Sequence, residues 1–363
     1  MTVKVPCATI DVSALRHNLA AVRRYAPASK VMAIIKANAY GHGLVAAALA
    51  LEGVEAFGVA RLEEGLALRS AGIATPIVLL EGVFNADELE QARRASLQIV
   101  VHSPEQIAML EQSGAGREFE IWLKVDTGMN RLGFRLEQFE PAWQRLRALD
   151  PRALRVMTHL AAAEVRNGEA TVAQLARFSS LTIAAGTERS VANSAGLILS
   201  EQARLEWVRP GLMLYGISPI PGVSAAELGL KPAMTLTTQL IAIRHVPAGE
   251  TVGYNGIWRA EQETRVGIAA VGYGDGYPRN LRSGCPVLVN GRETQVLGRV
   301  SMDMTAVDLQ KVDAKVGDPV TLWGEGLPVE RVAAFADTIA YELVCGISQR
   351  VAVEWKEQSG GAR

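Results

Sequence analysis

Short apolar runs rich in β-branched residues recur through the first part of the chain, about every 20 to 35 residues, between stretches with helical periodicity. The segment 13–25, for example, places Leu15, Leu19 and Val22 on one helical face. This alternation predicts repeated strand–helix units. The eight expected strands are 31–35, 56–60, 77–80, 98–101, 120–125, 154–158, 190–192 and 205–208.

A closed (β/α)8 barrel of the TIM type accommodates all eight units. An open, doubly wound α/β sheet would show the same local pattern. We favour the barrel, because no GxGxxG turn follows the first expected strand, as a dinucleotide-binding sheet would require. The glycine-rich segment 272–277 also fails that motif, since its sixth residue is Tyr277.

Turn-forming residues are densest at 218–224, which is typical of a linker. Beyond it, the pattern predicts one helix at 329–335 and strands at 234–243, 265–271, 286–289 and 320–323. We therefore expect two domains, with residues 1–220 as the barrel and residues 221–363 as a β-rich domain. This division allows the first strand of the chain to pack with the second domain.

Composition excludes some functions. The 363 residues are 49% hydrophobic and 21% charged, and the net charge of −1 gives no electrostatic footprint for nucleic acid or an anionic membrane. The first seven residues lack the apolar core of a secretion signal, and no apolar run could span a bilayer, so we expect a cytoplasmic protein. Three scattered cysteines, expected to be buried, indicate neither disulfides nor zinc, and no metal site is expected.

Lys36 ends the first apolar run and begins a glycine-rich turn. Because desolvation penalises a charged amine, a lysine at this place is neutralised, paired or covalently joined to a cofactor. In a barrel, the other strands end at the same face and bring further polar residues there: Lys124, His159, Asn193, Ser194 and Arg209. This set suits an anionic cofactor that reacts through an imine, such as pyridoxal phosphate. Ordinary strand-to-helix turns are the alternative.

An ordered series of motifs over nearly the whole chain resembles the alanine racemase family. The motifs are 31–43, 124–133, Asn193-Ser194, 208–211, Gly253-Tyr254, 272–276 and 298–303. The resemblance implies a barrel that binds pyridoxal 5'-phosphate, a following β domain, and a homodimer in which each chain completes the partner's active site. It also implies that the substrate is alanine and that its L and D isomers are interconverted.

The resemblance gives roles to two bases. Lys36 resembles the lysine that holds the cofactor as an imine and then acts on one face of the substrate, whereas a lysine at a strand end is ordinarily a surface residue. Tyr254 resembles the tyrosine that acts on the opposite face, although such a tyrosine is usually a packing residue. A free phenol is a poor base at neutral pH, so it needs a neighbouring cation or hydrogen-bond network. His159 and Arg209 are the expected helpers.

Further contacts with cofactor and substrate follow from the same resemblance. Arg209 resembles the arginine that bonds the pyridine nitrogen. Because a guanidinium keeps its proton, the ring would remain a weak electron sink, which restricts the chemistry to moving one proton. Arg131 resembles the arginine near the substrate carboxylate, and Lys124 resembles a lysine, often carbamylated, that holds this arginine. The cofactor-binding residues implied are Lys36, Tyr40, His159, Ser194, Arg209, Gly211 and Leu212.

Residues of the second domain resemble partner-chain residues at the entrance of the site. Tyr273, Met302 and Asp303 resemble those that narrow it and hold the substrate carboxylate, with Met302 acting through its backbone N–H. Arg279 resembles an arginine of the same entrance. Outside the resemblance, such residues are ordinarily packing or surface residues. Gln349 stands where some relatives have a phosphate-binding tyrosine, and it could donate a hydrogen bond instead.

Two alternative functions are a decarboxylase and a non-enzymatic carrier, both of which would also bind pyridoxal phosphate. A barrel-type pyridoxal-phosphate decarboxylase would be expected to have a glutamate at the pyridine nitrogen and a catalytic cysteine motif in the β domain, where this chain has Arg209 and Tyr254. A non-enzymatic carrier of pyridoxal phosphate would consist of a single barrel, which the β domain argues against. The sequence leaves open whether D-alanine is made or consumed, and whether serine is also a substrate.

Overall fold

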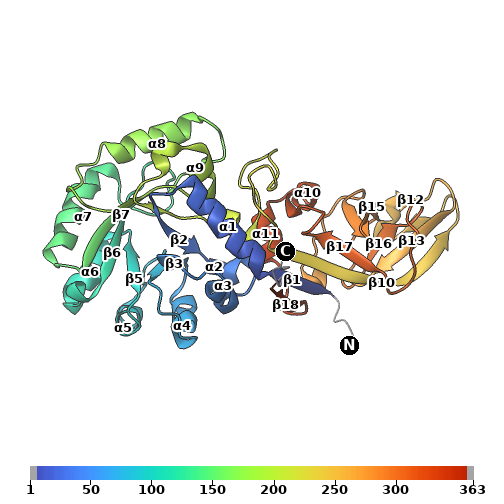
Figure 1. Cartoon of the computed structure of the whole chain (residues 1–363), viewed down its shortest axis with the longest axis horizontal. Helices are drawn as coiled ribbons and strands as arrows, with labels where there is room; N and C mark the ends of the chain where they lie inside the picture. Colours follow the sequence, from blue (N-terminus) through green and yellow to red (C-terminus); the bar gives the residue numbers. More distant parts are fainter. Residues whose placement is uncertain (1–5, 358–363) are drawn as a thin grey trace, which may run out of the picture.

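The computed structural model describes residues 6–357, which form a barrel joined to a β sheet (Figure 1). Residues 1–5, part of the stretch inspected for a secretion signal, lie outside it. The barrel is parallel and closed, with Val31 of the first strand opposite Val208 of the last. Its strands are β2 (Lys30–Ile34), β3 (Ala56–Val59), β4 (Ile77–Leu79), β5 (Gln98–Val101), β6 (Glu120–Lys124), β7 (Ala153–Met157), β8 (Arg189–Ser190) and β9 (Trp207–Val208). The predicted barrel is thus confirmed.

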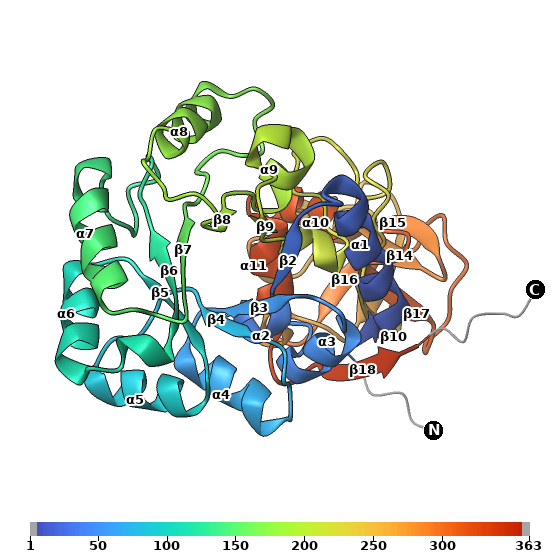
Figure 2. The same cartoon turned by 60° about the vertical axis from the view of Figure 1, so that its left-hand side comes forward.

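Helices cover the outside of the barrel (Figure 2). They are α1 (Val12–Tyr25), α3 (Leu44–Ala50), α4 (Leu62–Ser70), α5 (Ala86–Arg94), α6 (Pro104–Ser113), α7 (Leu136–Ala148), α8 (Glu169–Ser179) and α9 (Ser194–Leu199), with short 3₁₀ turns η1 (Gly116–Glu118), η2 (Glu201–Ala203) and η3 (Leu212–Tyr215). Strands such as β3 and β5 are buried along their whole length between barrel interior and helices. This explains why they read as continuous apolar runs rather than alternating ones.

The second part is an eight-stranded sheet in the order β13-β16-β15-β14-β17-β10-β1-β18. Its strands are β1 (Cys7–Asp11), β10 (Met234–Val246), β13 (Thr264–Ala269), β14 (Pro286–Val289), β15 (Arg292–Leu297), β16 (Thr305–Asp308), β17 (Pro319–Trp323) and β18 (Ala352–Lys356). Smaller elements are the ribbon β11 (Thr251–Val252) and β12 (Trp258–Arg259), the turns η4 (Tyr254–Gly256) and η5 (Tyr273–Asp275), and the helices α10 (Val329–Phe335) and α11 (Ala340–Cys345).

The first strand of the chain belongs to this second sheet and not to the barrel. In β1, Cys7 lies opposite Thr237 of β10 on one side and Ala352 of β18 on the other. Helix α1 follows at once, because the Asp11 carboxylate caps it by accepting the N–H groups of Ser13 and Ala14 at 2.8 and 3.2 Å. The junction of barrel and sheet is therefore built from segments near both ends of the chain.

Residues 218–224 contain turns and bends without a helix or strand, in keeping with the expected linker. Within the part of the chain that the structure describes, no helix has the length and apolarity needed to cross a membrane. The three cysteines are free thiols; Cys7 and Cys285 are buried, but Cys345 is exposed. The prediction that all three are buried is therefore wrong for Cys345.

Candidate active site

A cavity of about 510 Å³ opens at the carboxyl ends of the barrel strands. It gathers ten residues that the sequence analysis singled out: Lys36, Tyr40, Lys124, Arg131, His159, Asn193, Ser194, Arg209, Gly211 and Leu212. Four of them are cationic, and Glu81 is the only carboxylate residue in the cavity lining. The electrostatics of the cavity therefore favour an anionic ligand.

Lys36 comes directly before a left-handed turn. Short helix α2 (Lys36–Tyr40) contains four successive non-glycine residues with φ between 51° and 54°: Ala37, Asn38, Ala39 and Tyr40. Left-handed backbone costs an L-residue roughly 1–2 kcal/mol, and strain of this kind persists only where the surroundings impose it. The sequence predicted a turn after Lys36 but not its handedness.

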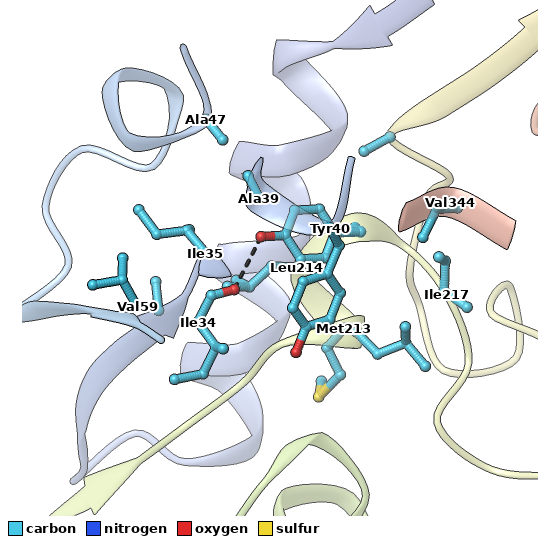
Figure 3. Close-up of a cluster of buried hydrophobic side chains, with 14 of the residues drawn as sticks. Ile34, Ile35, Ala39, Tyr40, Ala47, Val59, Met213, Leu214, Ile217 and Val344 are labelled. Carbon is cyan, nitrogen blue, oxygen red and sulfur yellow. Dashed lines mark hydrogen bonds between the residues drawn. The ribbon is translucent and has the colours of Figure 1, made fainter. Parts of the chain in front are cut away.

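Packing and hydrogen bonds on the far side of this turn hold it in place. The ring of Tyr40 stacks on Tyr215 at 4.8 Å, and the Tyr215 hydroxyl donates to the carbonyl of Ile34 at 2.9 Å (Figure 3). His42 is buried, with Nδ1 2.9 Å from the carbonyl oxygen of Tyr40. Burial lowers the pKa of His42 to about 4, so the ring is neutral and Nδ1 can act as the donor. His42 thus organises the turn.

A small-residue cradle lies where the turn meets the end of β9. The Ser194 hydroxyl oxygen accepts the N–H groups of Gly211 and Met213, at 2.9 and 3.3 Å. A Cβ atom on Gly211 would lie 2.5 Å from the Tyr40 hydroxyl oxygen, so this position has no room for a side chain. Burial, together with Tyr341 and Cys345, raises the pKa of Tyr40, which keeps its hydroxyl protonated as a donor. Backbone N–H groups and hydroxyls gathered in this way suit a phosphate.

Arg209 is buried in the cavity wall. Its Nη1 donates to the Ser190 hydroxyl at 2.5 Å, and its Nη2 donates to the carbonyls of Thr158 and Val191 at 2.5 and 3.1 Å. These bonds use only the terminal nitrogens, so within residues 6–357 the Nε–H is left without a protein acceptor. Burial lowers the pKa of Arg209 to about 10, and the guanidinium therefore remains charged at neutral pH.

The cavity lowers the pKa values of both His159 and Lys124. Burial, reinforced by the cations Arg209 and Lys124, holds the pKa of His159 well below its ordinary value. The imidazole is therefore neutral, and its Nδ1 lies 3.3 Å from Nη2 of Arg209, in reach of that donor. Burial, with Arg209 and Arg131 nearby, also lowers the pKa of Lys124 to about 8. A substantial share of this amine is neutral in mildly alkaline solution.

The residues singled out in the β domain lie elsewhere in the single chain. Tyr254, Met302 and Asp303 line a separate hollow of about 410 Å³, together with Gly253, Ser301 and Met304. None of these residues lines the barrel cavity. Tyr254 is 63% exposed and Met302 52% exposed. Within one chain, the fold therefore does not bring Lys36 and Tyr254 into a shared cavity.

Two of the entrance residues, Tyr273 and Arg279, line neither hollow. Tyr273 is exposed and its N–H bonds the carbonyl of Ser301 at 3.0 Å, while Arg279 is exposed. Asp303 accepts a hydrogen bond from Nη2 of Arg350 at 2.8 Å. These contacts order the rim of the β-domain hollow.

One tyrosine of the barrel cavity was missed in the sequence. Tyr341 of α11 lines the cavity, with its ring 5.6 Å from that of Tyr40. Gln349, the residue considered for this region, is exposed and does not line the cavity. The sequence offered only an isolated aromatic residue in a short apolar helix, and the contact arises because α11 of the second domain packs against α2 of the barrel.

The cavity also fits the groups of pyridoxal phosphate. Lys36 lines it with an amine, a hydroxyl and N–H cradle lies beside Tyr40, and Arg209 has an Nε–H without an acceptor among the described residues. Among the described residues, no three His, Cys, Asp or Glu side chains are grouped so that they could hold a metal ion. The fold and cavity define a two-domain barrel protein with a cationic cavity at the barrel mouth.

Comparison with known sequences identifies the family. Residues 10–219 match the family described as "Alanine racemase, N-terminal domain", and residues 233–355 match "Alanine racemase, C-terminal domain". The chain belongs to the alanine racemase family. The resemblance seen in the sequence is thereby confirmed.

Similar proteins cover nearly the whole chain. The biosynthetic alanine racemase of Escherichia coli K12 is 48% identical over 350 residues, which are 95% of this chain and 98% of that protein. The structure of biosynthetic alanine racemase from Pseudomonas aeruginosa is 44% identical, with a TM-score of 0.94 and coverage of 97% and 99%. Alanine racemase from Bartonella henselae with covalently bound pyridoxal phosphate is 29% identical, with a TM-score of 0.86 and coverage of 96% and 99%.

Proposed function

We propose that this chain is an alanine racemase that interconverts L-alanine and D-alanine with pyridoxal 5'-phosphate. The observation that carries this proposal is Lys36, which lines a cationic cavity at the barrel mouth and comes directly before a left-handed turn. When bound, pyridoxal phosphate supplies an electron-withdrawing ring that acidifies the α-proton of an amino acid joined to it. Membership of the alanine racemase family supports alanine as the substrate.

Different residues of the cavity would bind different groups of the cofactor. The Lys36 amine would bond the aldehyde carbon. Tyr40, Ser194, and the backbone N–H groups of Gly211 and Leu212 would bind the phosphate, with His159 beside the ring. Arg209 would donate its Nε–H to the ring nitrogen, and because a guanidinium keeps its proton, that nitrogen would stay an acceptor. The weaker electron sink would limit the chemistry to proton removal and return.

Lys36 and Tyr254 would move protons on opposite faces of the substrate. The lysine would exchange the α-proton of the D isomer and the tyrosine that of the L isomer. Since Tyr254 does not line the barrel cavity of its own chain and is largely exposed, we propose that a homodimer brings it to the cavity of the partner. Met304 and Ile257 are exposed apolar residues of the same region and support an interface there.

Other residues would bind the substrate and restrict access to it. Arg131 and the N–H of Met302 would hold the substrate carboxylate, and Lys124 would hold Arg131, as a carbamate where its neutral amine reacts with carbon dioxide. Tyr273, Asp303 and Arg279 would narrow the entrance, which excludes bulky side chains more effectively than a hydroxyl. We further propose a cytoplasmic location, in keeping with relatives named as biosynthetic enzymes.

The direct test is the chirality of free alanine after incubation of the purified chain with pyridoxal phosphate. Either isomer should converge on an equal mixture, and release of carbon dioxide from the amino acid would instead support a decarboxylase. Borohydride treatment should fix the cofactor to Lys36, and labelling of another lysine would refute that assignment. In deuterated water, Tyr254→Phe should slow exchange from L-alanine more than from D-alanine; equal slowing would contradict the proposed division of roles.

A further inference from the structure

The carboxylate of Glu64 links the turn after Lys36 to the end of the neighbouring strand. Glu64 lies in the first turn of α4, and its Oε1 accepts the N–H of Ala37 at 2.6 Å and that of Asn38 at 3.4 Å. Its Oε2 accepts the N–H of Ala60 at 2.8 Å and that of Arg61 at 3.3 Å. One side chain therefore satisfies four backbone donors on two barrel strand ends.

The two donors on the Lys36 side begin the left-handed turn. Ala39 is already bonded within the backbone, its N–H donating to the carbonyl of Ile35 at 2.8 Å. The N–H groups of Ala37 and Asn38 come before it and need an acceptor from outside the turn, as the first N–H groups of any helical turn do. Glu64 supplies that acceptor at the residues where the left-handed backbone begins.

We propose that Glu64 is a positioning residue, which fixes the direction of the Lys36 side chain by anchoring the left-handed turn that follows it. This inference rests on the proposed role of Lys36. A carboxylate is needed because both of its oxygens accept, whereas an amide has only one accepting oxygen and would turn donors toward one of the two N–H pairs. Such a change leaves the fold intact but loosens the placement of a reacting amine, and small misplacements are costly in catalysis.

A purely structural cap is the alternative, and the chain contains a matched control for it. Glu88 occupies the same place in α5, where its Oε2 accepts the N–H of Phe84 at 2.8 Å and its own N–H bonds Asn85. Glu88 has no bond to the turn after Lys36. Glu88→Gln therefore makes the same change from carboxylate to amide in a helix cap of the same kind, in the neighbouring strand–helix unit, without touching the proposed anchor.

The experiment compares Glu64→Gln, Glu64→Asp and Glu88→Gln in the full chain. Hydrogen exchange of the peptide containing residues 36–43, measured without cofactor, should speed up by roughly tenfold in Glu64→Gln and remain unchanged in Glu88→Gln. In the loaded enzyme, kcat should fall roughly tenfold or more in Glu64→Gln, with little change in KM, and Glu64→Asp should restore part of it.

Equal exchange of the 36–43 peptide in the wild type and Glu64→Gln would overturn the proposal, whatever the activity. Loss of kcat to the same extent in Glu88→Gln would also overturn it, because helix capping alone would then be sufficient. A wild-type chain that does not racemise alanine would refute the proposed function instead. The exchange measurement would still decide whether Glu64 anchors the turn, so the two failures are distinguishable.

Discussion

The Tyr40 hydroxyl oxygen lies where a side chain on Gly211 would have to be. A Cβ atom at this glycine would come within 2.5 Å of that oxygen and within 3.1 Å of the ring carbon that bears it. The Tyr40 side chain cannot easily move away from Gly211, because its ring stacks on buried Tyr215. The proposed phosphate cradle thus depends on a glycine for steric reasons, and not for a left-handed backbone.

Gly211→Ala should therefore displace Tyr40 and weaken pyridoxal phosphate binding by about tenfold or more, the effect of losing one or two good hydrogen bonds. Tyr40→Phe should weaken it less, since only one donor is lost. In the double variant the clash with the oxygen is gone, so the two effects should not add. Cofactor titration followed by absorbance measures all three variants, and strictly additive losses would contradict a steric origin.

The carboxylate of Glu188 should make the free energy of unfolding depend on pH in acid solution. Although burial alone would raise its pKa, hydrogen bonds from Lys30 and Arg155 hold it at about 2, against an ordinary value of 4.5. The carboxylate therefore stabilises the fold fully above pH 4.5, and this contribution is lost as the pH falls toward 2. Glu188→Gln should be less stable than the wild type at pH 7, with a gap that narrows at acid pH. Urea unfolding over this pH range measures the difference in unfolding free energy between the two proteins. A difference that does not change with pH would refute the prediction.

The buried amine of Lys124 should make stability depend on pH in alkali as well. Its pKa is lowered from 10.5 to about 8, so between these values the unfolded chain binds more protons at this site and stability rises with pH. In buffers free of carbon dioxide, Lys124→Met should be more stable than the wild type at pH 7, because a charged amine is no longer desolvated. The difference should shrink toward pH 10.5. Urea unfolding at increasing pH measures the difference in unfolding free energy between the two proteins, and a difference that stays constant would contradict this account.

Much of the barrel could be predicted from the sequence because its strands are buried on both faces. A continuous apolar run such as 98–101 then coincides with a strand, and the end of the run locates the strand end where functional residues lie. Lys36, His159 and Arg209 were predicted as site residues in this way, and all three line the cavity. For these elements, the local signal and the tertiary environment agree.

Other features depend on contacts between distant segments or on unusual backbone. Strands β1 and β18 pair with each other from near opposite ends of the chain, and neither has a pattern that predicts its partner. Tyr341 reaches the cavity only because α11 packs against α2. The left-handed turn has alanines where glycine would be expected, so the sequence did not indicate its handedness.

The central claim is that one active site uses Lys36 from one chain and Tyr254 from another. Complementation tests it most directly, by mixing and exchanging subunits of Lys36→Ala and Tyr254→Phe, each inactive alone. With random pairing, about a quarter of all sites should combine an intact lysine with an intact tyrosine, and racemase activity should return to about that fraction of the wild type. No recovery, although mass spectrometry shows that mixed dimers have formed, would contradict the account.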